Sequence, residues 1–352
     1  MSELLLRKFK ESQYTVLFNR NSGAFLRIGQ TESSPFFNVK TPELLDISIT
    51  NYCEKGCDFC YRSSNTNGKH MSLNEYSRLV KEAQQLGVLQ IALGGGNPNQ
   101  HPDFINILEV TRKHSIIPSY TTNGKGMTEE IYQATKKYCG ALAVSWYSPY
   151  TDALEVIEKC SLYGIKINIH YLLSKQTIEE AIAILHNKQL LEHINAIIFL
   201  NYKPIHTSSD LCLENNKNLY DFIKTIKLFK YCKVGFDSCM ISYLTPLINE
   251  IKPETVDFCE AARFSAFISE DSIMYPCSFM CDTSMRGIDL KKTSIQDAWI
   301  NGDIFQKIRL YLKTPSKQSY PILQCNNCKD YDFCHGGCQF FDINMCREIR
   351  TV

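Results

Sequence analysis

The sequence has no long apolar run and no excess of charge of either sign. No apolar stretch approaches the ~20 residues that a membrane helix needs, so a membrane-spanning helical protein is excluded. The 38 basic and 37 acidic residues nearly cancel, for a formal net charge of +1, and no block of like charge predicts nucleic acid as a partner. Met1–Lys8 contains too short an apolar run for a secretory signal, so a cytoplasmic protein is expected.

Cysteine, in contrast, is abundant, with 16 among 352 residues. In a protein without an export signal, this usage favours metal binding or catalysis over disulfides. The chain length predicts one large α/β domain and a smaller appendage. Some thiols have no partner at metal-binding spacing and are expected to pack as ordinary side chains: Cys139, Cys160, Cys212 and Cys232.

Short β-rich runs alternate with amphipathic segments between residues 45 and 235. This alternation predicts repeated βα units around a parallel sheet. Six such units make a partial (β/α)6 barrel of TIM type, in which reactive groups gather at the carboxyl ends of the strands. The predicted strands are 45–50, 89–93, 116–121, 141–146, 165–172 and 196–200, and the predicted helices are 73–86, 102–114, 128–138, 151–163, 177–191 and 216–230.

Two flanking segments differ from this pattern. Within residues 1–44, Tyr14–Phe18 and Ala24–Ile28 are β-rich runs around a turn, which predicts an appended β-hairpin. In residues 236–352 the alternation stops and cysteines accumulate. This part is predicted to be a smaller domain that metal holds together.

Three cysteines, Cys53, Cys57 and Cys60, follow the first predicted strand with the spacing C-x-x-x-C-x-x-C. Iron–sulfur clusters ordinarily have four thiolate ligands and structural zinc has four ligands. Three thiols therefore indicate a metal with one open coordination position. A zinc site, or three unrelated thiols, is the alternative.

This motif, with the aromatic Phe59 before its last cysteine, resembles the signature of the radical S-adenosylmethionine (SAM) superfamily. The resemblance implies that the three cysteines bind three irons of a [4Fe–4S] cluster and that SAM binds the fourth iron. It also implies a contact of Phe59 with the cofactors. In that family the reduced cluster cleaves SAM to a 5'-deoxyadenosyl radical, which removes a hydrogen atom from the substrate.

The stretch Gly94–Pro98 after the second strand is similar to the Gly-Gly-Glu-Pro element that receives the SAM ammonium group in this family. The resemblance implies cofactor contacts at Gly95, Gly96 and Asn97. Asn97 replaces the usual glutamate; its amide oxygen still accepts a hydrogen bond, but without charge assistance. Glutamate at position 97 is therefore expected to retain SAM cleavage. Further SAM contacts implied by the resemblance, each with a plain turn or packing residue as the alternative, are Asn123, Ser145 and Leu200.

The second cysteine group has the spacing C-x-x-C-x5-C-x3-C-x7-C and resembles the SPASM extension of peptide-modifying radical SAM enzymes. That resemblance implies two auxiliary [4Fe–4S] clusters. The outer cluster takes Cys325, Cys328, Cys334 and Cys346, and the inner cluster takes Cys259, Cys277 and Cys338. For the fourth inner ligand Cys239 is favoured, with Cys281 or an open iron as alternatives. A zinc-binding extension is the alternative interpretation, because C-x-x-C pairs also bind zinc.

The resemblance implies an enzyme that cleaves SAM and modifies a peptide or protein side chain, by crosslinking, epimerisation or oxidation. The resemblance also implies ribosomally made peptides as the substrate class and a flavodoxin or ferredoxin as the reductant. Two alternatives stay open: a radical SAM enzyme for a small metabolite, and a non-catalytic iron–sulfur or zinc scaffold. No catalytic base is predicted, although Asp237, Glu270 and Asp282 are candidates.

Overall fold

The computed structural model describes residues 4–31, 35–206, 208–247, 249, 256–314 and 325–346. The chain folds into two compact units. The first unit comprises Met1–Val144, Asp152–Lys166 and Ala261–Gln306, and the second comprises Ser145–Thr151, Ile167–Glu260 and Lys307–Val352.

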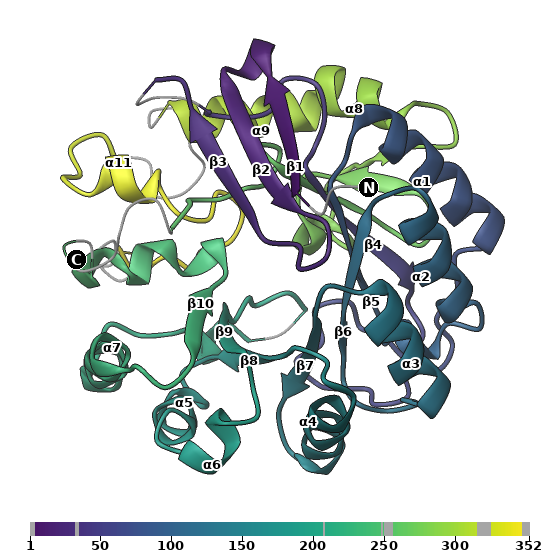
Figure 1. Cartoon of the computed structure of the whole chain (residues 1–352). Coiled ribbons are helices and arrows are strands. Elements are labelled where there is room, and N and C mark those ends of the chain that lie inside the picture. Colours follow the sequence, from purple (N-terminus) through teal and green to yellow (C-terminus); the bar gives the residue numbers. More distant parts are fainter. Residues whose placement is uncertain are drawn as a thin grey trace. The chain divides into compact units, whose positions relative to one another are not determined.

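A mostly parallel sheet forms the centre of the first unit (Figure 1). Its strands β4 to β7 follow one another along the sheet, and β11 pairs in parallel with the other side of β4. Antiparallel β12 and β13 complete this side. The strands are β4 (Leu44–Thr50), β5 (Gln90–Gly95), β6 (Ile117–Thr122), β7 (Leu142–Trp146), β11 (Ser265–Ile268), β12 (Ile273–Tyr275) and β13 (Ile288–Asp289).

Helices α1 to α3 lie along one side of this sheet (Figure 1). In α1, the Ser72 side chain accepts a hydrogen bond from the N–H of Glu75, and Gly87 ends the helix at φ 85°. These are the start and stop signals expected of a capped helix. The helices of the first unit are α1 (Leu73–Leu86), α2 (Phe104–Lys113), α3 (Glu129–Tyr138), α4 (Thr151–Tyr163) and α8 (Ile295–Asn301); α9 (Asp303–Lys313) begins there.

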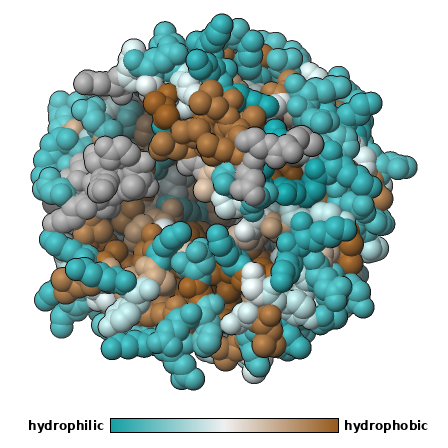
Figure 2. Space-filling view, in the orientation of Figure 1, coloured by the Kyte–Doolittle hydropathy of each residue, from teal (hydrophilic) through white to brown (hydrophobic). Residues whose placement is uncertain are grey.

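The N-terminal segment is a three-stranded antiparallel sheet, where two strands were expected. It consists of β1 (Leu4–Phe9), β2 (Tyr14–Asn19) and β3 (Phe25–Gly29). One face buries Tyr14, Val16 and Phe18 of β2 against barrel residues. The other face is apolar but exposed, and Figure 2 shows this patch near the top of the molecule. Its exposed side chains are Leu4, Leu6, Leu26 and Ile28.

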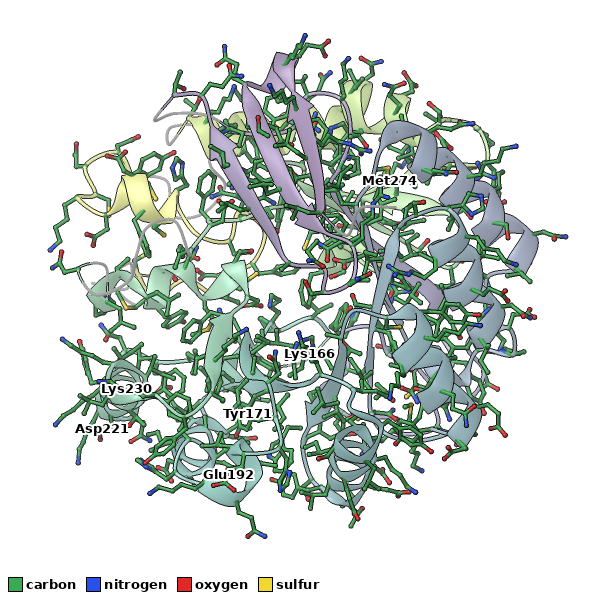
Figure 3. The ribbon with its side chains drawn as sticks, in the orientation of Figure 1. Lys166, Tyr171, Glu192, Asp221, Lys230 and Met274 are labelled. Atoms are coloured by element: carbon green, nitrogen blue, oxygen red, sulfur yellow. The ribbon has the colours of Figure 1, made fainter. Side chains whose placement is uncertain are left out.

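Three parallel strands with helices form the second unit: β8 (Ile167–Leu173), β9 (Ala196–Asn201) and β10 (Lys233–Phe236). Tyr171 on β8, labelled in Figure 3, donates its hydroxyl hydrogen bond to the carbonyl of Thr177 and lies 3.2 Å from Glu180 Oε2. This contact fixes the strand to the helix that follows it. The helices are α5 (Ile178–Ile184), α6 (Lys188–Leu191), α7 (Lys217–Leu228) and α11 (Tyr331–Cys334).

Outside the N-terminal segment, four strands were not expected from the sequence: β10, β11, β12 and β13. β10 adds a further parallel strand beside β9, and β11, from the segment assigned to the extension, pairs with β4 of the barrel region. A four-residue strand containing Gly235 carries too weak a pattern for recognition. Within the described ranges, no helix has the length and apolar character needed to cross a membrane.

Candidate iron–sulfur and SAM site

The loop that carries Cys53, Cys57 and Cys60 begins where β4 ends, at Thr50. The β4–β5 ladder shifts register between Ser48 and Thr50, directly before this loop. A hydrogen bond of 3.0 Å from the N–H of Cys60 to the carbonyl of Cys57 closes a turn that contains the last two cysteines. All three thiols are half-buried, at the carboxyl end of the strand where the sequence placed them.

The sulfur of Cys53 lies beside two N–H groups. The side-chain Nδ2 of Asn123 donates to Cys53 Sγ at 3.3 Å, and the backbone N–H of Lys55 lies 3.5 Å from the same sulfur. Hydrogen bonds of this kind stabilise negative charge on a thiolate. Asn123 thus reaches the cysteine loop, while its role as a SAM contact stays a prediction.

The donor set of this loop suits an iron–sulfur cluster. All sixteen cysteines lie within the described ranges, and none of them forms a disulfide. Among the residues that the structure describes, no three Cys, His, Asp or Glu side chains come close enough to share one metal ion. A cluster needs no such convergence, because each thiolate binds a different iron.

The glycine loop after β5 packs directly on the cysteine loop. Gly96 donates its N–H to the carbonyl of Thr50 at 2.7 Å, and Asn97 donates its N–H to the carbonyl of Tyr52 at 2.8 Å. A Cβ on Gly95 or Gly96 would lie 2.0 Å from one of these carbonyl oxygens, and Gly95 also has φ 109°. Packing between the two loops is therefore sufficient reason for both glycines.

Gly94 differs from the two glycines that follow it. A Cβ at this position would meet no atom within 4 Å. The end of β5 therefore borders open space beside the cysteine loop. This is the kind of cradle that a backbone-bound cofactor such as SAM requires, and the sequence did not single out Gly94 as a contact.

The side chain of Asn97 is buried, with an exposed fraction of 1%, and bonded within the protein. Its Oδ1 accepts hydrogen bonds from the Asn123 N–H at 3.1 Å and from Thr122 Oγ1 at 3.2 Å. Its Nδ2 donates to the carbonyl of Lys125 at 2.9 Å. The amide thus ties the β6 loop to the β5 loop, which changes the expectation for glutamate at this position: a carboxylate has no donor for the Lys125 carbonyl.

The other residues predicted to contact SAM lie in three different parts of the fold. Phe59 is half-buried in the cysteine loop. Ser145 on β7 and Leu200 on β9 belong to the second unit and are half-buried there. Their roles as cofactor contacts stay predictions.

A buried arginine, Arg62, follows the cysteine loop and was not recognised from the sequence. Its side chain is fully buried and bonds two carboxylates at 2.7 Å, Glu270 through Nη2 and Asp282 through Nη1. Glu270 also accepts a 2.8 Å hydrogen bond from Ser48 Oγ on β4. This ion-pair network ties the cysteine loop to the segments around β12. In the sequence, Arg62 is marked only by its position two residues after Cys60.

The four cysteines predicted for the outer cluster lie near one another in the second unit. Burial, with the neighbouring Cys346, Cys325 and Cys328 thiols, raises the pKa of Cys334 to about 12. The N–H of Cys328 also donates to the carbonyl of Cys325 at 3.3 Å. Metal ligation needs the opposite state, the thiolate, so a bound cation would have to offset the mutual repulsion of these sulfurs.

Two of the cysteines predicted for the inner cluster are in contact. A hydrogen bond with Cys338, together with burial, raises the pKa of Cys239 well above its usual value. Cys281, the competing candidate, belongs to the first unit, where its thiol lies 3.6 Å from Asp282 Oδ1. Burial raises the pKa of Cys281 to about 11, while the Arg62 charge opposes that rise. The fourth ligand of the inner cluster stays a prediction.

The carboxylates considered as bases are all in ion pairs. Asp237 lies 2.7 Å from Lys203 Nζ, and Glu270 and Asp282 share Arg62. The side chain of Asp282 is 41% exposed, against 9% for Glu270 and 19% for Asp237. Asp282 is thus the most accessible of the three.

Comparisons with known proteins agree with this geometry. The profile of the "Radical SAM superfamily" matches residues 47–150, the cysteine loop and the strands after it. Mycofactocin maturase MftC of Mycobacterium tuberculosis (strain CDC 1551 / Oshkosh) is 22% identical over 326 residues, covering 85% of this chain and 79% of MftC. A probable GTP 3',8-cyclase of Pyrococcus abyssi (strain GE5 / Orsay) is 33% identical over 144 residues, covering 36% of this chain and 46% of the cyclase.

Among solved structures, Streptococcus suis SuiB bound to precursor peptide SuiA superposes with a TM-score of 0.74 at 15% identity. The superposition covers 96% of this chain and 94% of SuiB. This likeness confirms the predicted fold class, an α/β fold of the partial-barrel type. The radical SAM match over residues 47–150 implies SAM and a [4Fe–4S] cluster as cofactors. Residues 47–150 form a radical SAM domain, and the chain is a radical SAM enzyme.

Proposed function

We propose that the chain is a SPASM-type peptide maturase, which cleaves SAM reductively and modifies a side chain of a ribosomally made peptide. Cys53, Cys57 and Cys60 hold the cluster to which SAM binds. When bound, cluster and SAM together supply the radical that removes a substrate hydrogen atom. The protein's part is to hold the thiolates, to donate hydrogen bonds to Cys53, and to keep open the space beside Gly94.

The observation that carries this proposal is the packing of the glycine loop on the cysteine loop. The two backbone bonds from Gly96 and Asn97 join loops that follow different strands, and Asn123 from a third strand reaches Cys53. Three strand ends thus converge on one set of thiols. The peptide substrate is supported by MftC, a maturase by name, and by SuiB, whose structure holds a precursor peptide.

The finer assignments are part of the same proposal. Residues 1–44 form an N-terminal appendage, 45–235 the radical SAM barrel and 236–352 the auxiliary domain. That domain carries two auxiliary clusters, with the outer and inner ligand sets predicted from the cysteine spacing. The contact of Cys239 with Cys338 supports Cys239 as the fourth inner ligand. Sixteen cysteines without a disulfide support a cytoplasmic location, and a flavodoxin or ferredoxin supplies electrons.

A radical SAM enzyme for a small metabolite is the second candidate. The match to a probable GTP 3',8-cyclase favours it, but that match covers only 36% of this chain, whereas the MftC match covers 85%. A non-catalytic metal scaffold is the third candidate function, and such a protein would not turn over SAM. Formation of 5'-deoxyadenosine separates this reading from both enzymes.

The test is anaerobic reconstitution with iron and sulfide, chemical reduction, and quantification of 5'-deoxyadenosine from SAM. The wild type should form it, and Cys57→Ala should abolish its formation. Cys232→Ala is the matched control, since this half-buried thiol lies outside all cysteine motifs. Three bound clusters without any 5'-deoxyadenosine would refute the enzyme reading.

A second variant tests the auxiliary domain and the substrate class. Cys328→Ala should keep SAM cleavage but lose peptide modification, because its thiol belongs to the proposed outer cluster. Iron content and the [4Fe–4S] EPR signals report cluster loss independently of activity. Peptides encoded by genes beside that of this enzyme are the substrates to assay by mass spectrometry. Modification of a small metabolite instead of any such peptide would overturn the peptide assignment.

A further inference from the structure

The first unit has a cavity of about 240 Å³ at the end of the sheet opposite the cysteine loop. Leu89, directly before β5, and His114 and Ser115, shortly before β6, line it. These residues precede the strands, whereas the cysteine and glycine loops follow them. The cavity is therefore separate from the proposed SAM site. Leu5 and Arg7 of β1, Phe18 of β2 and Arg20 in the turn after β2 form its other wall.

The polar part of this wall is basic. Arg7, Arg20 and His114 line the cavity, and no carboxylate lines it among the residues that the structure describes. Arg7 uses one guanidinium nitrogen to donate to the carbonyl of Gly87, at the end of α1. A guanidinium has five N–H donors, so this bond leaves others available. His114 holds its Nδ1 2.9 Å from the carbonyl of Val110, which fixes the proton on Nδ1 and leaves Nε2 for another partner.

The positive charges lie close enough to act on one another. Burial lowers the pKa of Arg7, and the charge of Arg20 lowers it further. Burial also lowers the pKa of Arg112, whose Nη1 donates to the Arg20 carbonyl at 2.7 Å; the Cys139 thiol opposes this shift, and the Arg20 charge adds to it. Within the described ranges, neither Arg7 nor Arg112 forms an ion pair. Such a group of like charges is stabilised by an anion.

We propose that this cavity binds a small oxyanion, a carboxylate or a phosphoryl group, through the guanidinium groups of Arg7 and Arg20. Guanidinium matches the planar geometry of both groups and donates two hydrogen bonds at once. The volume is below the ~300–1,000 Å³ of pockets for drug-sized ligands, which restricts the ligand to a small molecule. The remaining walls are apolar, at Leu5, Phe18 and Val88, and accommodate a short carbon chain.

The bound anion has a structural consequence. It bridges β1 and β2 of the N-terminal sheet to the ends of α1 and α2, which carry Gln84 and His114 beside the cavity. A ligand that binds only the folded state raises stability by mass action. The melting temperature therefore reports binding without reference to SAM chemistry, and the result does not depend on the proposed function.

The experiment uses the full chain with its clusters reconstituted, in a buffer free of phosphate and carboxylate. The melting temperature is followed as inorganic phosphate or glutarate is added, with sodium chloride at matched ionic strength as the salt control. A rise with phosphate alone identifies a phosphoryl ligand, and a rise with glutarate a carboxylate ligand. No rise with either probe beyond the chloride control overturns the proposal.

Two glutamine variants on α1 give a matched test. Gln84→Glu puts a carboxylate into the cavity wall, where it competes with the anion, and should abolish the response. Gln85→Glu adds the same charge at the next exposed position, which does not line the cavity, and should respond as the wild type does. Arg7→Gln should weaken binding about tenfold or more, the loss expected for a charge-assisted hydrogen bond. An unchanged response of Gln84→Glu overturns the proposal, even if Arg7→Gln fails to fold.

Discussion

The side-chain amide of Asn123 donates a hydrogen bond to the sulfur of Cys53 at 3.3 Å. Asn123 is buried, and its own backbone N–H is held by the side chain of Asn97. The position of this donor therefore depends on a second asparagine, Asn97. Hydrogen bonds to cluster sulfurs are among the factors that set a cluster's reduction potential.

Asn123→Ala is expected to lower the midpoint potential of the SAM-binding cluster by roughly 20–60 mV, the equivalent of one neutral hydrogen bond for a one-electron couple. The sign follows because an N–H donor stabilises the reduced, more negative cluster. EPR-monitored redox titration measures it. Asn106→Ala is the control, an exposed asparagine whose side chain bonds Asp103. Equal potentials in the wild type and Asn123→Ala would show that this bond has no influence.

Asn97→Glu is expected to lower the free energy of unfolding by about 1–3 kcal/mol, because the Lys125 carbonyl loses its donor in a buried position. Asn97→Asp removes the same donor with less change in shape and should also be destabilising. Denaturant unfolding measures both. Asn187→Asp is the control, since this helix-capping side chain uses only its oxygen, as acceptor from the Leu190 N–H. Wild-type stability of Asn97→Glu would contradict the bonding described for this amide.

Two neighbouring glycines, Gly94 and Gly95, are expected to be needed for different reasons, one for SAM binding and the other for folding. Gly95→Ala should destabilise the fold, because its Cβ would lie 2.0 Å from the Thr50 carbonyl oxygen at φ 109°. Gly94→Ala should keep the melting temperature, since its Cβ meets no atom within 4 Å. If SAM occupies that space, Gly94→Ala should at the same time weaken SAM binding, which calorimetry measures. Unchanged SAM affinity in Gly94→Ala would place the cofactor elsewhere.

Patterns that are local in the sequence were predictable. The strands β4 to β9 lie over the predicted ranges because their buried, β-rich runs are bounded by clear turn and cap signals. The cysteine trio was recognised because its spacing is compact. The strand β1 was missed, since Leu4 and Leu6 face outward and Arg7 and Lys8 end the apolar run. An amphipathic edge strand with its apolar side exposed shows little of the usual alternation.

Relationships between distant segments were not predictable. Nothing near Cys53 in the sequence indicates Asn123, and nothing near β4 indicates that β11 pairs with it. Asn97 illustrates the same limit: the motif comparison did not indicate the bonds of its amide to the β6 loop, and its role as a cofactor contact stays a prediction. One sequence shows residue types and spacing, but the identity of a hydrogen-bond partner follows only from the folded chain.

Arg62→Met is expected to lower the free energy of unfolding by about 3–5 kcal/mol, the usual result of breaking a buried ion pair. Met has similar length, so the loss comes from the carboxylates, above all Glu270, whose side chain is only 9% exposed. Denaturant unfolding of the apo chain measures this. Lys113→Met is the control: this lysine is 67% exposed, pairs with Glu109 on the same helix and should cost less than about 1 kcal/mol. If Glu270→Gln restores stability in the Arg62→Met background, the unpaired carboxylate is confirmed as the cause of the loss. Equal stability of Arg62→Met and Lys113→Met would exclude this cause.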